Sequence, residues 1–276
     1  MKILYISEGA VHEYMCDMLF HGLRSLLGAD VVDVNCMEFM YKDTIHGGYT
    51  LWGLLPNLGV DREDIPGKIR NRYFDLVIYG MAHIWRAYLD EVIAAYPPSR
   101  IVFVDGCDDH NVAPVQGKGL YFKRELSEDR PPGILSIQFG IPKEKVRLEI
   151  PKKVRLMAPL DPADRSTYGY VTEESYYQQY CESYFGRTMK KGGWDCLRHY
   201  EIIAAGCLPY FVGLEACPPR TLEHLPKADL LQAKQLHDNW RGEDGAWQEL
   251  MLRVRATLLE DLTTEALARR LLEKVV

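Results

Sequence analysis

The stretch that decides the fold spans residues 190–212 and reads KKGGWDCLRHYEIIAAGCLPYFV. Its two adjacent glycines let the backbone turn tightly and come close to a ligand. Asp195 is a good helix N-cap, so we expect a helix over Asp195–Ala205 that ends at Gly206. The apolar run Leu208–Val212 that follows is typical of a buried strand. The stretch therefore predicts a loop, a helix and a strand in succession.

The start of the predicted helix has the features of an anion-binding site. Helix N-termini carry unpaired N–H groups and a partial positive charge, and Lys190, Lys191 and Arg198 add full charges nearby. Arg198 and Glu201 are three residues apart and share a helix face. The arginine can hold a phosphate through two N–H groups, and the glutamate can accept from ribose hydroxyls. The alternative is a plain turn, a helix cap and a surface ion pair worth at most about 1 kcal/mol.

The rest of the chain extends the α/β pattern. A helix is predicted over Glu13–Leu27 and another over residues 84–96, between apolar runs that predict parallel strands covered on both faces. No G-x-G-x-x-G follows the first strand, which argues against a dinucleotide cofactor. The proline-rich residues 151–164 predict a linker, so we expect domains at 1–150 and 151–276. The predicted strands of the first domain are Lys2–Ser7, Val31–Val34, Leu76–Tyr79, Ile101–Val104, Leu120–Lys123 and Ser136–Phe139. Further helices are predicted at Glu173–Tyr184, Ala246–Leu259 and Thr264–Val275.

Composition narrows the class of protein. The 276 residues carry a net charge of −6, which does not favour binding to a nucleic acid backbone. Seven scattered cysteines form no C-x-x-C pair, so we expect free thiols rather than disulfides or a zinc site. No secretory signal opens the sequence, and no run approaches the about 20 apolar residues that span a bilayer. We therefore expect a cytoplasmic protein.

Polar residues follow two predicted strands of the first domain, where ligands bind to a parallel sheet. Asp108 and Asp109 follow one strand, and His12 and Glu13 follow another. Asp109, with His12 as second choice, is the candidate general base for an acceptor hydroxyl. An Asp-rich turn, a metal cluster and a solvated helix start are the alternatives. Further candidates for phosphate or acceptor contacts are Lys123, Arg124, Glu13 and Asp108.

The segment KKGGWDCLRHYEIIAAGCLPYF, at 190–211, resembles the donor site of GT-B-fold glycosyltransferases. It is most similar to the exostosin-like and spore-protein-like families, in which an Arg-x-x-Glu helix precedes a Gly-Cys-x-Pro turn. EYMCDMLFHGLRSLLGADVVDVN, at 13–35, and YFKREL, at 121–126, resemble the amino-terminal half of bacterial proteins grouped with these enzymes. The resemblance implies two Rossmann-like domains facing a cleft. Residues 151–276 are short for such a domain, which predicts a reduced second sheet.

The resemblance also implies a function. A nucleotide sugar, expected to be a UDP-sugar, would bind the second domain and lose its sugar to an acceptor hydroxyl at the first, with no metal or other cofactor. Two alternatives remain open: a binding module without turnover, and an enzyme that glycosylates a modified nucleic acid base. Four tyrosines at 176, 177, 180 and 184 are expected to pack rather than to stack on a sugar. The residues implied to contact the donor are Lys191, Gly192, Gly193, Arg198, His199 and Glu201.

Overall fold

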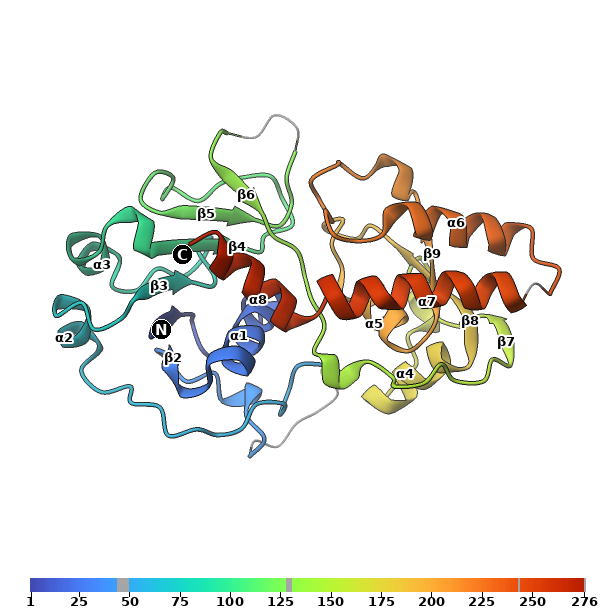
Figure 1. Cartoon of the computed structure of the whole chain (residues 1–276), viewed down its shortest axis with the longest axis horizontal. Helices are drawn as coiled ribbons and strands as arrows, with labels where there is room; N and C mark the ends of the chain where they lie inside the picture. The colour runs from blue at the N-terminus through green and yellow to red at the C-terminus, as the bar shows by residue number, and fades with distance from the viewer. Residues whose placement is uncertain (44–49, 128–130, 243, 276) are drawn as a thin grey trace.

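The computed structural model describes residues 1–43, 50–127, 131–242 and 244–275. They form two α/β lobes that lie side by side (Figure 1). The sheet of the first lobe has six parallel strands in the order β2-β1-β3-β4-β5-β6. These strands are β1 (Ile3–Ile6), β2 (Val31–Asp33), β3 (Leu76–Tyr79), β4 (Ile101–Asp105), β5 (Leu120–Lys123) and β6 (Ile134–Ser136).

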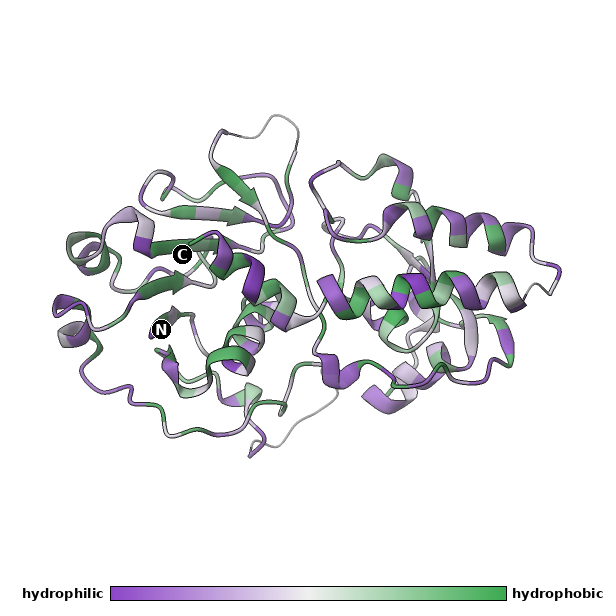
Figure 2. Ribbon diagram, viewed as in Figure 1, coloured by the Kyte–Doolittle hydropathy of each residue, from purple (hydrophilic) through white to green (hydrophobic). Residues whose placement is uncertain are grey.

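Both faces of this sheet are covered, as its continuous apolar strands require. Along β1, Ile3 and Tyr5 face a core shared with α1 (Tyr14–Leu27) and α8 (Thr264–Glu273). Leu4 and Ile6 face a second core beneath α2 (Ile65–Arg70) and α3 (Leu89–Ala95). Figure 2 shows the green, apolar strands between helices whose outer faces carry the purple, polar residues. The carboxyl ends of the strands are thereby left free to carry a site.

The second lobe is smaller. Its parallel sheet has three strands in the order β7-β8-β9, so the predicted reduction of the second sheet is confirmed. The strands are β7 (Arg155–Met157), β8 (Ser183–Met189) and β9 (Leu208–Val212). The helices are α4 (Glu173–Cys181), α5 (Leu197–Ala204), α6 (Lys227–Asp238) and α7 (Asp244–Asp261). Short 3₁₀ turns lie at Gly28–Asp30, Glu38–Met40, Pro98–Arg100, Lys143–Lys145, Arg165–Thr167 and Leu214–Ala216.

The C-terminal helix returns to the first lobe. Helix α7 runs along the second lobe, and α8 continues across to pack against α1 (Figure 1). The Nδ1 atom of His21 on α1 lies 2.8 Å from Thr264 Oγ1 on α8. A Cβ atom at Gly22 would overlap the backbone carbonyl oxygen of Thr264, so glycine allows this close approach. The division at residue 150 remains a prediction, but α8 packs with the first lobe rather than with residues 151–263.

Several predicted boundaries are wrong. Helix α4 ends at Cys181 because β8 begins at Ser183, inside the helix predicted to reach Tyr184. Strand β6 begins two residues and ends three residues before its predicted bounds, and α3 covers only Leu89–Ala95 of the helix predicted over 84–96. All seven cysteines are free thiols. Among the described residues, no helix is long and apolar enough to cross a membrane.

Candidate functional site at the cavity between the lobes

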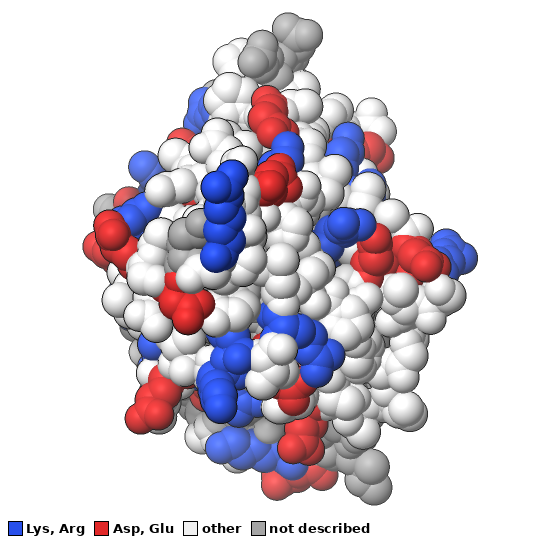
Figure 3. All heavy atoms as spheres, turned by 90° about the vertical axis from the view of Figure 1, so that its right-hand side faces the viewer, with Lys and Arg blue, Asp and Glu red and all other residues white. Residues whose placement is uncertain are grey.

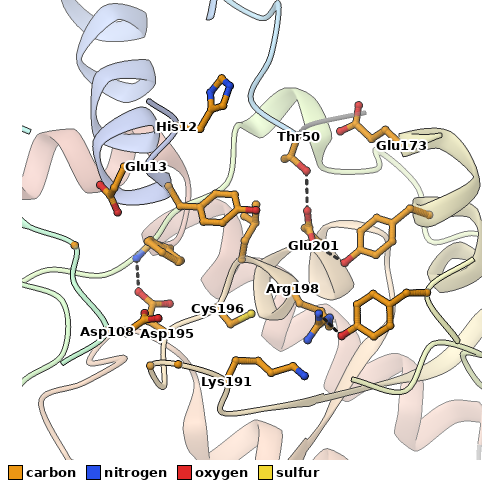
Figure 4. A pocket seen from close by; sticks show the side chains of 18 of the residues that line it. His12, Glu13, Thr50, Asp108, Glu173, Lys191, Asp195, Cys196, Arg198 and Glu201 are labelled. Carbon is orange, nitrogen blue, oxygen red and sulfur yellow. Dashed lines mark hydrogen bonds between the residues drawn. The ribbon is translucent and has the colours of Figure 1, made fainter. Parts of the chain in front are cut away.

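A cavity of about 730 Å³ lies between the two lobes. The first lobe contributes residues that follow β1, β4 and β5, including His12, Asp108 and Arg124. The second lobe contributes the loop after β8, the start of α5 and residues 168–176. In Figure 4, Glu13 and Asp108 lie on one side of the cavity and Arg198 and Glu201 on the other. The carboxyl ends of strands from both sheets thus meet at one site, as is usual for ligand sites on parallel sheets.

The start of α5 differs from the prediction. The helix begins at Leu197 with Cys196 as N-cap, so the predicted capping role of Asp195 is wrong. The carboxylate of Asp195 instead accepts from the Phe139 amide at 2.6 Å and from the Tyr200 hydroxyl at 2.9 Å. The Asp195 amide donates to Glu125 Oε1 at 2.9 Å. The bonds to Phe139 and Glu125 fix the loop before α5 to the first lobe.

The two glycines of the loop serve this junction. A Cβ atom at Gly192 would overlap the carboxylate of Asp108, and one at Gly193 would overlap the carboxylate of Glu125. Both carboxylates belong to the first lobe, so the glycines are required for close contact between the lobes. The sequence predicts that the backbone comes close to another group at these glycines, and it does so. The groups that it approaches are the protein's own carboxylates. Both glycines also line the cavity, where a ligand contact remains a prediction.

Arg198 has unused hydrogen-bonding capacity in the cavity wall. Its Nη2 donates to the Tyr168 hydroxyl at 2.9 Å, and its guanidinium carbon lies 5.6 Å from the centroid of the Tyr168 ring. Its Nε and Nη1 atoms are buried and have no hydrogen-bond partner in the described part of the chain. Unpaired buried donors cost about 1–3 kcal/mol each. An anionic ligand that reached these atoms would relieve that cost.

Glu201 lies one turn further along α5 and also lines the cavity. Its Oε1 accepts from Thr50 Oγ1 of the first lobe at 2.7 Å, and its Oε2 accepts from the Tyr176 hydroxyl at 2.6 Å. Burial raises the pKa of this carboxyl. The sequence predicts a packing role for Tyr176 and gives no indication for Thr50, yet both residues line the cavity. Their only sequence signal is their residue type, because they come from segments distant from α5.

Lys123 and Arg124 are less available to a ligand than expected. Lys123 is buried outside the cavity lining, with its Nζ 2.9 Å from Asp105 Oδ1. Arg124 lines the cavity, but its guanidinium donates to the Gly106 carbonyl, to Asp108, to Glu125 and to the Asp195 carbonyl. The buried position of Lys123 therefore contradicts the predicted contact between this residue and a phosphate. Arg124 links the lobes.

Of the residues proposed as the base, His12 lines the cavity and Asp109 does not. Asp109 is largely exposed, and a hydrogen bond from the Asn111 amide lowers its pKa, which makes it a weaker base. The neighbouring Asp108 occupies the lining position instead. The His12 ring contacts the rings of Phe39 and Trp52, at centroid distances of 4.1 and 5.0 Å. Partial burial lowers its pKa, so the imidazole is neutral at pH 7.

Of the remaining candidates, Glu13 and Lys191 line the cavity, whereas His199 does not. Glu13 caps α1, accepting from the Met15 and Cys16 amides at 3.2 and 2.7 Å, and it lines the cavity. Lys191 also lines the cavity, and its Nζ donates to the Pro162 carbonyl. His199 does not line it.

The His199 ring is buried between Thr188 Oγ1 and the Trp194 carbonyl, each 2.8 Å away. Burial lowers its pKa to about 3, so His199 is a neutral structural residue. Among the described residues, no group of three His, Cys, Asp or Glu side chains is arranged to hold a metal ion. The prediction of metal-independent chemistry remains a prediction.

No family model and no curated protein matches this sequence. Solved structures do match. One is an α-glucosyltransferase in complex with UDP and a 13-mer DNA containing a HMU base, with a TM-score of 0.50, 9% identity, and coverage of 100% of this chain and 99% of that chain. Another is an α-glucosyltransferase in complex with UDP-glucose and DNA containing an abasic site, with a TM-score of 0.50, 10% identity, and coverage of 100% and 99%. The chain shares the overall fold of these solved structures. The narrower resemblance to exostosin-like and spore-protein-like families stays a prediction.

Proposed function

We propose that this protein is a glycosyltransferase that moves a sugar from a UDP-sugar to an acceptor hydroxyl. The observation that carries the proposal is the wall formed by α5, where Arg198 presents unpaired buried N–H groups beside Glu201. A diphosphate is a ligand that a guanidinium binds through two parallel hydrogen bonds. The solved structures of the same fold contain UDP or UDP-glucose, which supports UDP as the nucleotide.

In the proposed reaction, residues 151–276 hold the donor and residues 1–150 hold the acceptor. The acceptor oxygen forms a bond to the anomeric carbon as the bond from that carbon to the diphosphate oxygen breaks. Arg198 and Lys191 stabilise the negative charge on the departing UDP, a contribution that is usually the largest in such reactions. His12 takes the proton of the acceptor hydroxyl, because its neutral imidazole lies on the first-lobe side of the cavity.

Glu201 is proposed to accept from the ribose hydroxyls. Its two oxygens already accept from Thr50 and Tyr176. Because each carboxylate oxygen has two lone pairs, a ribose hydroxyl can be added without losing both bonds. Alternatively, the ribose displaces the Thr50 hydroxyl, which would open the contact between the lobes on this side.

The function is tested by following thermal unfolding with UDP, GDP and dTDP, and then with UDP-sugars. UDP at one hundred times its Kd should stabilise the protein by about 2.7 kcal/mol, whereas GDP and dTDP should have little effect. Slow hydrolysis of the preferred UDP-sugar should then be detectable as release of UDP. If no nucleotide or nucleotide sugar shifts unfolding, the chain is a binding module of another kind and the proposal is wrong.

A second candidate is transfer to a modified base in nucleic acid. The DNA present in two solved structures of this fold favours it. The net charge of −6 does not favour it, and Figure 3 shows acidic and basic side chains interspersed over the end of the second lobe. DNA binding whose affinity falls steeply with salt would support this acceptor. Binding of UDP without any salt-dependent DNA binding would point to another hydroxyl.

A further inference from the structure

A second cavity, of about 250 Å³, lies at the junction of the lobes. Its apolar wall consists of Phe122 on β5, Leu135 on β6, and Leu267 and Leu271 on α8. The second lobe closes it with residues of the segment 220–224, after β9. The two cavities lie beside adjacent residues of the segment after β6, because Gln138 lines the second cavity and Phe139 lines the first.

The charged side chains of this cavity are unevenly matched. Arg220, Arg270 and Lys274 line it together with two carboxylates, Glu223 and Glu273. Glu223 accepts a hydrogen bond from Ser136 Oγ, which uses part of its capacity. The lining therefore has one more cation than carboxylates.

Arg270 is the central cation. Its Nη1 donates to the Asp261 carbonyl, and its Nη2 is buried with no hydrogen-bond partner in the described part of the chain. Burial lowers the pKa of this guanidinium, although its side chain is 24% exposed. The Asp261 carboxylate already lies near this guanidinium, with Oδ1 3.8 Å from Nη1. A carboxylate bound in this cavity would supply the acceptor that Nη2 lacks.

We propose that this cavity binds a small organic carboxylate with an apolar body. The carboxylate pairs with Arg270, and the body lies against Leu135, Leu267 and Leu271. At the packing density of protein interiors, the cavity holds about ten non-hydrogen atoms. An inorganic anion has no apolar body to contact the leucines, and a neutral analogue has no charge to pair with Arg270. Neither therefore matches both the apolar and the charged part of the cavity.

The site is connected to the first cavity by hydrogen bonds. Gln138 Oε1 accepts from the His224 amide at 2.7 Å, and Gln138 Nε2 donates to the Tyr200 hydroxyl at 3.2 Å. The Tyr200 hydroxyl donates to Asp195 Oδ1 at 2.9 Å, and Asp195 lines the first cavity. A ligand that contacts both lobes here changes the same junction that positions the loop before α5. Binding at the two cavities should therefore be coupled, and any coupling is reciprocal.

The binding test is calorimetric titration of the 276-residue chain with benzoate, benzamide and inorganic phosphate. Benzoate should bind, and Arg270→Gln should weaken it about tenfold or more. Arg269→Gln is the matched control, because Arg269 is the exposed neighbour on the same helix and does not line the cavity. Leu135→Trp fills the cavity without removing Arg270 and should also abolish binding, and unfolding curves check that each variant is folded.

Equal benzoate affinity in Arg270→Gln and in the unchanged protein would overturn the proposal, as would phosphate or benzamide binding as tightly as benzoate. The coupling is tested separately, by titrating UDP with and without saturating benzoate. A changed UDP affinity supports the link between the cavities, and an unchanged one contradicts it. If UDP does not bind at all, the proposed function fails, while the carboxylate site is still decided by the benzoate titrations.

Discussion

Asp195 has the sequence context of a helix N-cap, but its side chain has another role in the folded structure. Its position before a helix matches an N-cap, but its carboxylate bonds to Phe139 and Tyr200. Burial raises its pKa to about 7, against the opposing charge of Arg124. The folded state therefore holds a proton on Asp195 over a pH range in which the unfolded chain has released it.

This residue should make folding stability depend on pH. Between the unfolded pKa of about 4 and the folded pKa of about 7, the folded state binds more protons, so stability falls as pH rises, by up to about 1.4 kcal/mol per pH unit. Asp195→Asn removes the titration and should flatten that part of the profile. Urea unfolding from pH 4 to 8 measures it. An unchanged slope in the variant would show that other groups cause the dependence.

The sequence predicts only part of the site at the scale of residues. Arg198 and Glu201 share a helix face by their spacing, and the structure places both in the cavity wall. Thr50, Tyr168 and Tyr176 could not be predicted as their partners, because they come from other segments and contact α5 only after folding. Asp109 and Asp108 are adjacent, and periodicity cannot decide which of two loop residues faces a cavity.

At the scale of elements, long and strongly periodic segments were predictable. Helix α1 begins one residue after its predicted start, and β3 and β9 match their predicted ranges. Strand β8 was missed, because SYFGRTM mixes polar and apolar residues and its start continues the tyrosine-rich pattern of α4. Strand β7 was also missed. It is short and largely exposed, and its sequence contains no apolar run that would indicate a strand. The contact of α1 with α8 joins opposite ends of the chain and has no local signal.

That helix contact depends on Gly22. Gly22→Ala should destabilise the protein by about 1–3 kcal/mol, because the new Cβ overlaps the Thr264 carbonyl and separates α1 from α8. The overlap should outweigh the higher helix propensity of alanine. Gly59→Ala is the control, since nothing lies within 4 Å of a Cβ atom there. Equal unfolding midpoints for the two variants in urea would contradict this account of the contact.

At the scale of the molecule, Arg124 joins the lobes. Its buried guanidinium donates to Asp108 and Glu125 of the first lobe and to the Asp195 carbonyl of the second. The cation thus neutralises acidic side chains at the base of the cavity.

Arg124→Met should cost about 3–5 kcal/mol of folding stability, because it leaves buried carboxylates without their cation. Arg100→Met, at an exposed arginine that donates to the Asp75 carbonyl, should cost less than about 1 kcal/mol. Denaturant unfolding compares the two. A loss below about 1 kcal/mol for Arg124→Met would mean that the lobes do not depend on this residue.

The central claim is that a nucleoside diphosphate binds against α5 and is held by Arg198. Calorimetric titration of UDP into the unchanged protein, Arg198→Gln and Arg165→Gln tests it most directly, because Arg165 is an exposed arginine of the same lobe outside the cavity. Loss of charged hydrogen bonds worth about 1.5–3 kcal/mol should weaken UDP binding about 10- to 150-fold in Arg198→Gln and leave Arg165→Gln within about twofold. UDP affinity that is equal in all three proteins would contradict the claim.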